Sequence, residues 1–145
     1  KTTTLNNELR ILKKYKNINN LAEKLYNDNG TLNIECDEDI NNTKHHLAMN
    51  INFYLEDFLK KYDSKQVMGV ITQEFLSEDY ERLFNNPITQ KEKKGYKING
   101  EIPSKYLSEK GRHNLRKYLE NDYKCIDKLY RDHLLSNKQY KKLME

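Results

Sequence analysis

One amphipathic stretch in the C-terminal half of the chain constrains the fold more than any other feature. Its apolar residues recur mainly at intervals of three and four, and they are Leu115, Tyr118, Leu119, Tyr123, Ile126, Leu129, Tyr130 and Leu134. This spacing places them on one face of a helix, while charged residues occupy the opposite face. The pattern predicts one long helix over residues 104–134, with a kink or division at Gly111, and its apolar face must pack on other helices.

Apolar residues at the same helical spacing predict four further helices. Three of them cover residues 4–26, 43–62 and 67–84. The fourth is a short C-terminal helix whose start is indicated by Ser136 and Gln139, because a Ser followed three residues later by Gln is typical of a capping box.

The stretches between these helices carry weaker signals. Residues 32–36 alternate between apolar and polar, which predicts a short strand or an extended segment, and residues 37–43 are polar and acidic, as in a loop. An Asn-Gly pair between short alternating arms predicts a β-hairpin near residues 96–102, and residues 85–95 predict a mobile loop. We therefore expect a mainly α protein, with residues 1–145 forming a single-domain bundle of about five helices and at most one short hairpin.

The charge of the chain is unevenly distributed. Residues 1–86 contain 11 Lys or Arg and 14 Asp or Glu, a net charge of −3, whereas residues 87–145 contain 15 and 8, a net charge of +7. A basic C-terminal half favours an acidic protein, a nucleic acid or an anionic membrane face as partner. The predicted partner-binding surface comprises Lys91, Lys93, Lys94, Lys97, Lys105, Lys110, Arg112, Arg116 and Lys117.

The spacing of the histidines and the absence of nucleophile motifs argue against catalysis. His45 and His46 are adjacent, and His113 and His133 are 20 residues apart, so neither pair has the spacing of metal ligands. The chain contains no Cys-x-x-Cys, no Gly-x-Ser-x-Gly and no Gly-rich phosphate loop. We therefore predict a non-enzyme with no catalytic residue, no metal site and no cofactor.

The cysteines and the hydropathy of the chain bear on its setting. The chain has two cysteines, Cys36 and Cys125, which are too few for a disulfide framework. This favours a reducing compartment, such as the cytoplasm of the cell that makes the protein or of a host cell. No apolar run is long enough to span a membrane. The leading hypothesis is a helical protein-interaction module that presents its basic surface to an acidic protein partner, with the partner and the oligomeric state left open.

A nucleic-acid-binding regulator is the first alternative. The order of the predicted hairpin and the long helix is similar to the wing and following helix of small bacterial repressors, over about residues 95–131. The resemblance implies that the hairpin lysines lie along a groove and that helix 67–84 is the recognition helix. The charged residues of that helix are Glu74, Glu78, Asp79, Glu81 and Arg82, a mainly acidic set that repels phosphates.

An adaptor that grips a target helix is the second alternative. Residues 25–36 and 58–75 resemble EF-hand helix-loop-helix units in outline. With Gly30 at the sixth loop position, Leu25 is first and Cys36 is twelfth, so these ligand positions lack carboxylates. The resemblance therefore implies a degenerate, light-chain-like adaptor without bound calcium.

Overall fold

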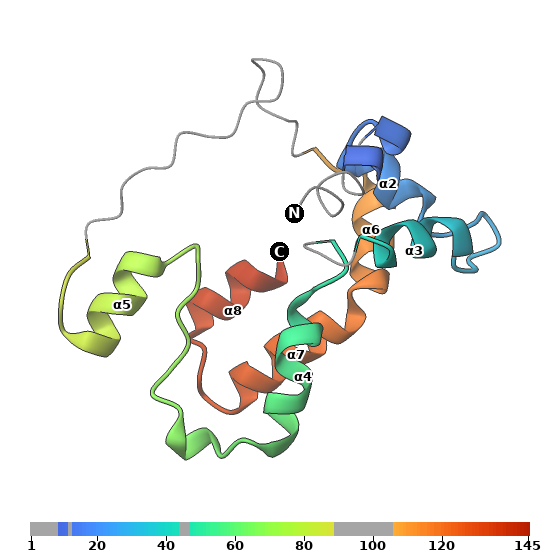
Figure 1. Ribbon diagram of the computed structural model, residues 1–145. Coiled ribbons are helices and arrows are strands. Elements are labelled where there is room, and N and C mark those ends of the chain that lie inside the picture. The colour runs from blue at the N-terminus through green and yellow to red at the C-terminus, as the bar shows by residue number, and fades with distance from the viewer. Residues whose placement is uncertain (1–8, 12, 44–46, 89–105) are drawn as a thin grey trace. The chain divides into compact units, whose positions relative to one another are not determined.

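The computed structural model describes residues 9–11, 13–43, 47–88 and 106–145 (Figure 1). The helices are α2 (Ile18–Lys24), α3 (Ile34–Asn41), α4 (Ile51–Lys61), the 3₁₀ helix η1 (Ser64–Gln66), α5 (Leu76–Phe84), α6 (Glu109–Tyr118), α7 (Glu120–Arg131) and α8 (Asn137–Met144). Residues 9–11 and 13–15 are helical as well. No strand occurs in the described residues, where Tyr26 and Leu32 form an isolated antiparallel bridge. The prediction of a mainly α fold is therefore confirmed.

The chain divides into two compact units. Unit 1 comprises Lys1–Phe53 and Gly95–Glu120, and unit 2 comprises Tyr54–Lys94 and Asn121–Glu145. Each unit has its own cluster of buried apolar residues. The single domain stays a prediction. The hairpin predicted near residues 96–102 and residues 89–95 of the predicted loop lie outside the described residues.

In unit 1, helix α2 packs closely on α6. The buried cluster of this unit comprises Ile11, Tyr15, Leu21, Leu25, Cys36 and Ile40. A Cβ atom at Gly111 of α6 would lie 2.9 Å from Oδ1 of Asn19 and 3.4 Å from Cβ of Ala22. Gly111 therefore lies in the contact between the two helices, where an added Cβ atom would require the Asn19 side chain to move.

In unit 2, the buried cluster is built mainly from α7 and the segment that follows it. It comprises Leu59, Cys125, Ile126, Leu129, Leu134 and Leu135, and Val67 and Val70 pack against it from the chain before α5. The predicted capping box of α8 is present. Ser136 Oγ accepts a hydrogen bond from Gln139 N at 3.2 Å, and Gln139 Oε1 accepts one from Ser136 N at 2.7 Å.

The predicted continuous helix over residues 4–26 is wrong, because the chain leaves the helical conformation before α2. Lys16 has a left-handed φ of 67°, and Asn17 is extended, with φ −153° and ψ 170°. The Asn17 side chain accepts a hydrogen bond from Asn20 N at 2.8 Å. This local bond caps a new helix at residue 18 and makes a break more stable than continuation.

The long helix predicted over residues 104–134 is also interrupted. Ser108 caps α6 by accepting a hydrogen bond from Gly111 N at 3.0 Å, so the helix begins later than predicted. The interruption lies at Leu119, where φ is −95° and ψ is 22°, and not at Gly111. The expectation of a kink at Gly111 is wrong because this glycine permits helix packing instead of relieving strain.

Two further predictions fail for reasons of local hydrogen bonding. Residues 34–41 form α3 and not a strand followed by a loop, because the Asn33 side chain accepts a hydrogen bond from Cys36 N at 3.2 Å and caps the helix. In the predicted helix 67–84, only α5 is helical. Residues 67–72 are not helical, and the N–H of Thr72 donates to the side chain of Asp79.

Candidate functional site: the basic surface of helix α6

The structure places four of the predicted partner-binding residues on α6. They are Lys110, Arg112, Arg116 and Lys117, and all four are exposed. The other five, Lys91, Lys93, Lys94, Lys97 and Lys105, lie outside the described residues. The candidate surface is therefore the exposed side of α6, where only Glu109 of the helix carries a negative charge.

Lys110 and Lys117 lie on one flank of α6, and both contact the turn between α2 and α3. Lys110 Nζ lies 3.3 Å from Asp28 Oδ1. Lys117 Nζ donates to the backbone oxygen of Gly30 at 3.1 Å and lies 4.2 Å from the ring centroid of Tyr26. These lysines contact the turn between α2 and α3, so part of their charge serves the packing of unit 1.

Arg112 and Arg116 lie on the other flank of α6, which we call the arginine flank. They are four residues apart, so their side chains stand one helical turn from each other on the same side. Helical spacing places them roughly opposite the flank of Lys110 and Lys117. The arginine flank thus presents two arginine side chains that are exposed to solvent.

A buried polar contact fixes the rotation of α6 about its axis. The buried Asn114 donates through Nδ2 to the backbone oxygens of Ala22 at 3.0 Å and Glu23 at 3.2 Å. Ser108 Oγ donates to Glu23 Oε1 at 2.5 Å, and the Ser108 amide donates to Asn19 at 2.7 Å. Because α6 cannot turn without breaking these bonds, the arginine flank faces away from α2.

A buried carboxylate, Asp39, joins α3 to the helical residues before α2. It accepts hydrogen bonds from Arg10 at 3.0 Å, from Tyr15 Oη at 2.9 Å and from Lys14. Burial raises the pKa of Asp39, but the bonds from Lys14 and Tyr15 and the charges of Lys14 and Arg10 outweigh burial and lower the pKa. Its partners therefore favour the ionised form of Asp39, and the hydrogen bonds connect α3 to the helical residues before α2.

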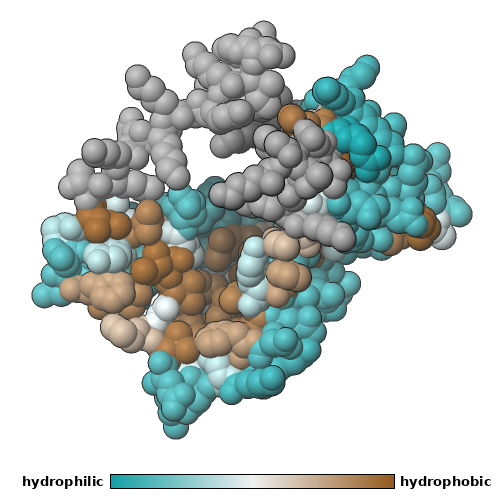
Figure 2. Space-filling view, viewed as in Figure 1, coloured by the Kyte–Doolittle hydropathy of each residue, from teal (hydrophilic) through white to brown (hydrophobic). Residues whose placement is uncertain are grey.

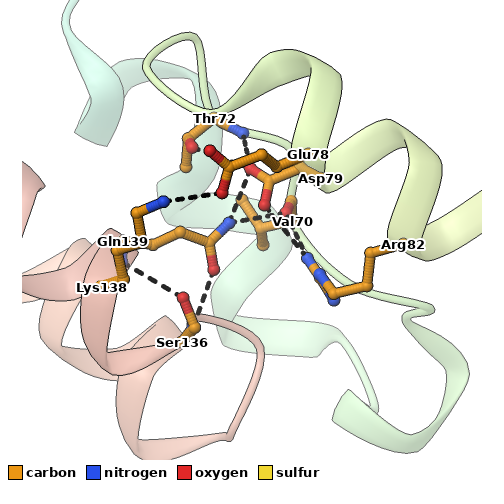
Figure 3. Close-up of polar contacts among 8 residues, drawn as sticks. All are labelled: Val70, Thr72, Glu78, Asp79, Arg82, Ser136, Lys138 and Gln139. Carbon is orange, nitrogen blue, oxygen red and sulfur yellow. Dashed lines mark hydrogen bonds and ion pairs between the residues drawn. The ribbon is translucent and has the colours of Figure 1, made fainter. Parts of the chain in front are cut away.

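A second buried carboxylate, Asp79, joins α5 to α8 in unit 2. Figure 3 shows its contacts: Oδ2 accepts hydrogen bonds from Thr72 N, Thr72 Oγ1 and Gln139 Nε2, each at 2.8 Å. Burial raises the pKa of Asp79, but these hydrogen bonds and that of Arg82 outweigh burial and lower the pKa. Gln139 also donates to the Val70 oxygen at 3.1 Å. The hydrogen bonds of this carboxylate are thus made to donors of the same chain.

The two cysteines and the possible metal ligands bear on catalysis, for the residues that the structure describes. Cys36 and Cys125 are buried, and burial raises the pKa of both thiols. A neutral buried thiol is a poor nucleophile. Among the residues that the structure describes, no group of three or more His, Cys, Asp or Glu could hold a metal ion. Within the same residues, no helix has the length and apolarity that crossing a membrane requires.

Comparisons with known proteins identify no relative. No family model matches the chain, and neither does a curated protein or a solved structure. The sequence prediction singled out neither Asp39 nor Asp79 as a buried group. One signal for Asp79 does exist, because it falls four residues after Phe75 and four before Leu83 and therefore shares their face of α5.

Proposed function

We propose that this protein is a non-enzymatic protein-interaction module and that the arginine flank of α6 binds an acidic protein surface. The observation that carries the proposal is the pair of exposed arginines, Arg112 and Arg116, on a helix whose rotation Asn114 fixes. A guanidinium group presents a planar fork of donors that matches a carboxylate, so two of them one turn apart suit an acidic partner.

The buried polar groups support a role in binding more than a role in catalysis. Asp39 and Asp79 are both occupied by donors from the same chain, and both cysteines are buried. Catalytic groups need access to substrate, and such groups are typically exposed in a cleft. A nucleic-acid partner is less favoured, because the exposed side of α5 carries Glu78 and Glu81.

The test is fluorescence anisotropy with two labelled probes, a short Glu-rich peptide and a duplex DNA of mixed sequence, at low and near-physiological salt. The double variant Arg112→Glu and Arg116→Glu is compared with the wild type. We expect the variant to bind the acidic peptide about tenfold more weakly, since two attractive charges become repulsive.

The matched control is Lys61→Glu with Lys65→Glu, which makes the same change in charge at two exposed residues of unit 2. It should leave the affinity for the peptide nearly unchanged. An equal loss in the control would mean that net charge alone attracts the probe. Tighter binding of the duplex, with a steep dependence on salt, would favour the nucleic-acid regulator and contradict the proposal.

A further inference from the structure

A second surface lies in unit 2, on the segment of residues 67–72 that leads from η1 toward α5. Figure 1 draws this segment as an extended run of chain. Val67 and Val70 pack against the buried cluster of unit 2, and Thr72 is buried beside Asp79. Two of the three other residues in the segment, Met68 and Ile71, point outward and are 73% and 38% exposed.

Helix α5 extends the apolar character of this segment. A Cβ atom at Gly69 would lie only 2.8 Å from Cδ2 of Leu83, so the segment runs directly against the C-terminal part of α5. Next to Leu83, the side chain of Phe84 is 50% exposed, and its ring packs at a tilt against that of Tyr80 with ring centroids 4.7 Å apart. Figure 2 shows apolar side chains gathered over α5 and the chain that leads into it. We call Met68, Ile71 and Phe84 the apolar strip.

Several backbone N–H groups of this segment have no hydrogen-bond acceptor among the described residues. The N–H of Val67 donates to Ser64 O, and the N–H of Thr72 donates to Asp79. Within the described part of the chain, no hydrogen bond is made by the N–H groups of the four residues between them, numbers 68–71. Free donors on a non-helical segment can pair with another extended backbone, and the positive φ of 153° at Gly69 makes this segment an irregular one and not a regular strand.

The charges around the strip are mainly acidic. Residues 67–85 contain four acidic residues and one basic residue, and two of the acidic residues are paired, Asp79 with Arg82 and Glu78 with Lys138, which leaves Glu74 and Glu81 exposed. The basic residue, Arg82, is 50% exposed and pairs with Asp79, with NH2 lying 3.4 Å from Asp79 Oδ1 and 3.4 Å from the Val70 oxygen. Glu81 is exposed on α5, one turn from Phe84 and on the same side of the helix. A ligand of this surface therefore needs basic residues beside its apolar ones.

We propose that the apolar strip is a docking site for an extended segment of a partner protein that alternates large apolar residues with Lys or Arg. The partner backbone pairs with residues 68–71, its apolar side chains cover Met68, Ile71 and Phe84, and its basic residues face the acidic side of α5. This site is separate from the arginine flank and takes a ligand of the opposite charge.

The test measures binding of labelled short peptides to the full chain by fluorescence anisotropy. The first peptide alternates Val and Lys, the second alternates Val and Glu, and the third is the Val-Lys peptide with alternate backbone nitrogens methylated. We expect saturable binding of the first peptide and binding about tenfold weaker for the other two, because one lacks the complementary charge and the other lacks backbone donors.

Two variants locate the site. Met68→Ser with Ile71→Ser removes exposed apolar groups and should weaken binding of the Val-Lys peptide about fivefold or more. Ile34→Ser is the matched control, since Ile34 is exposed in unit 1, and it should bind like the wild type. Circular dichroism of both variants serves to check that they remain helical.

Several outcomes would overturn the proposal. Equal binding of the methylated peptide would mean that no backbone pairing occurs, and equal binding of the Val-Glu peptide would remove the charge argument. Absence of saturable binding, or an equal loss in Ile34→Ser, would show that the strip is not a specific site. Dimerisation that Met68→Ser with Ile71→Ser abolishes would identify a second copy of the chain as the occupant instead.

Discussion

Unit 1 and unit 2 each bury a carboxylate, and they stabilise it in different ways. Asp39 in unit 1 is paired with two cationic side chains, Arg10 and Lys14, and one hydroxyl group. Asp79 in unit 2 is held mainly by neutral donors, from Thr72 and Gln139. The cations around Asp39 are 57% and 36% exposed, whereas Thr72 and Gln139 are buried.

This difference determines what each carboxylate contributes. When the charge of Asp39 is lost, Arg10 and Lys14 can turn to water, and the hydroxyl of Tyr15 is, among the described residues, the one buried donor that still needs an acceptor. When Asp79 is lost, buried donors have no water to replace it, and the full cost of desolvating them appears. Two carboxylates with similar burial should therefore differ in their energetic importance and in their response to salt.

Removal of the Asp79 carboxylate should have the largest effect. We expect Asp79→Ala to lower the free energy of unfolding of unit 2 by about 3 kcal/mol, because donors of Thr72 and Gln139 are left buried without an acceptor. Chemical denaturation measures the loss, and amide hydrogen exchange should report it in α5 and α8. The control is Glu78→Ala on the same helix, which breaks only the surface ion pair with Lys138, at 2.7 Å. A similar loss in both variants would contradict the central role of Asp79.

Loss of one donor to Asp79 should have a smaller effect. We expect Thr72→Val, which keeps the shape but removes the hydroxyl group, to cost about 1.5 kcal/mol, since a hydrogen bond to a charged acceptor is lost. Thr43→Val is the matched substitution in unit 1, where the hydroxyl donates to the neutral Ile40 oxygen at 2.7 Å. Thermal denaturation compares the two. The comparison fails if Thr43→Val is the more destabilising variant.

Replacement of Asp39 should cost less than either change around Asp79. We expect Asp39→Asn to destabilise unit 1 by about 1 kcal/mol, because its exposed cations regain water and Tyr15 keeps an acceptor. Added salt should reduce this cost, since it screens the ion pairs in the wild type, and should reduce the cost of Asp79→Ala less, because Arg82 is the one cationic partner of Asp79 among the described residues. Denaturation at low and high salt checks this. Equal salt dependence would show that the two carboxylates are stabilised alike.

The effect of acid on the stability gap between wild type and Asp79→Ala should be the smallest of these effects. The pKa values of Asp39 and Asp79 are both lowered in the folded protein. Their contributions are therefore complete above the unfolded pKa of about 3.9 and are lost as the pH falls through the folded values. We expect the gap in melting temperature between wild type and Asp79→Ala to narrow below about pH 4. A gap that stays constant down to strongly acidic pH would contradict an ionised Asp79.

The sequence by itself determined the helical class and the elements whose signals are local. The apolar stripe at intervals of three and four predicted the inner face of α7, including Ile126 and Leu129, and the pair of Ser136 and Gln139 predicted the capping box of α8. These features depend on residues within one or two turns of each other. The spacing of residues along the sequence is therefore enough to predict them.

Only the tertiary structure decided which polar groups are buried and which distant groups they contact. Asn114 meets the Ala22 oxygen 92 residues away, and Gln139 meets Asp79 60 residues away. Such contacts also separate the predicted basic residues of α6, since Lys110 and Lys117 hold a turn while Arg112 and Arg116 lie on the opposite flank. Periodicity reports which residues share a helix face, but the partner that this face meets is set by packing between distant segments.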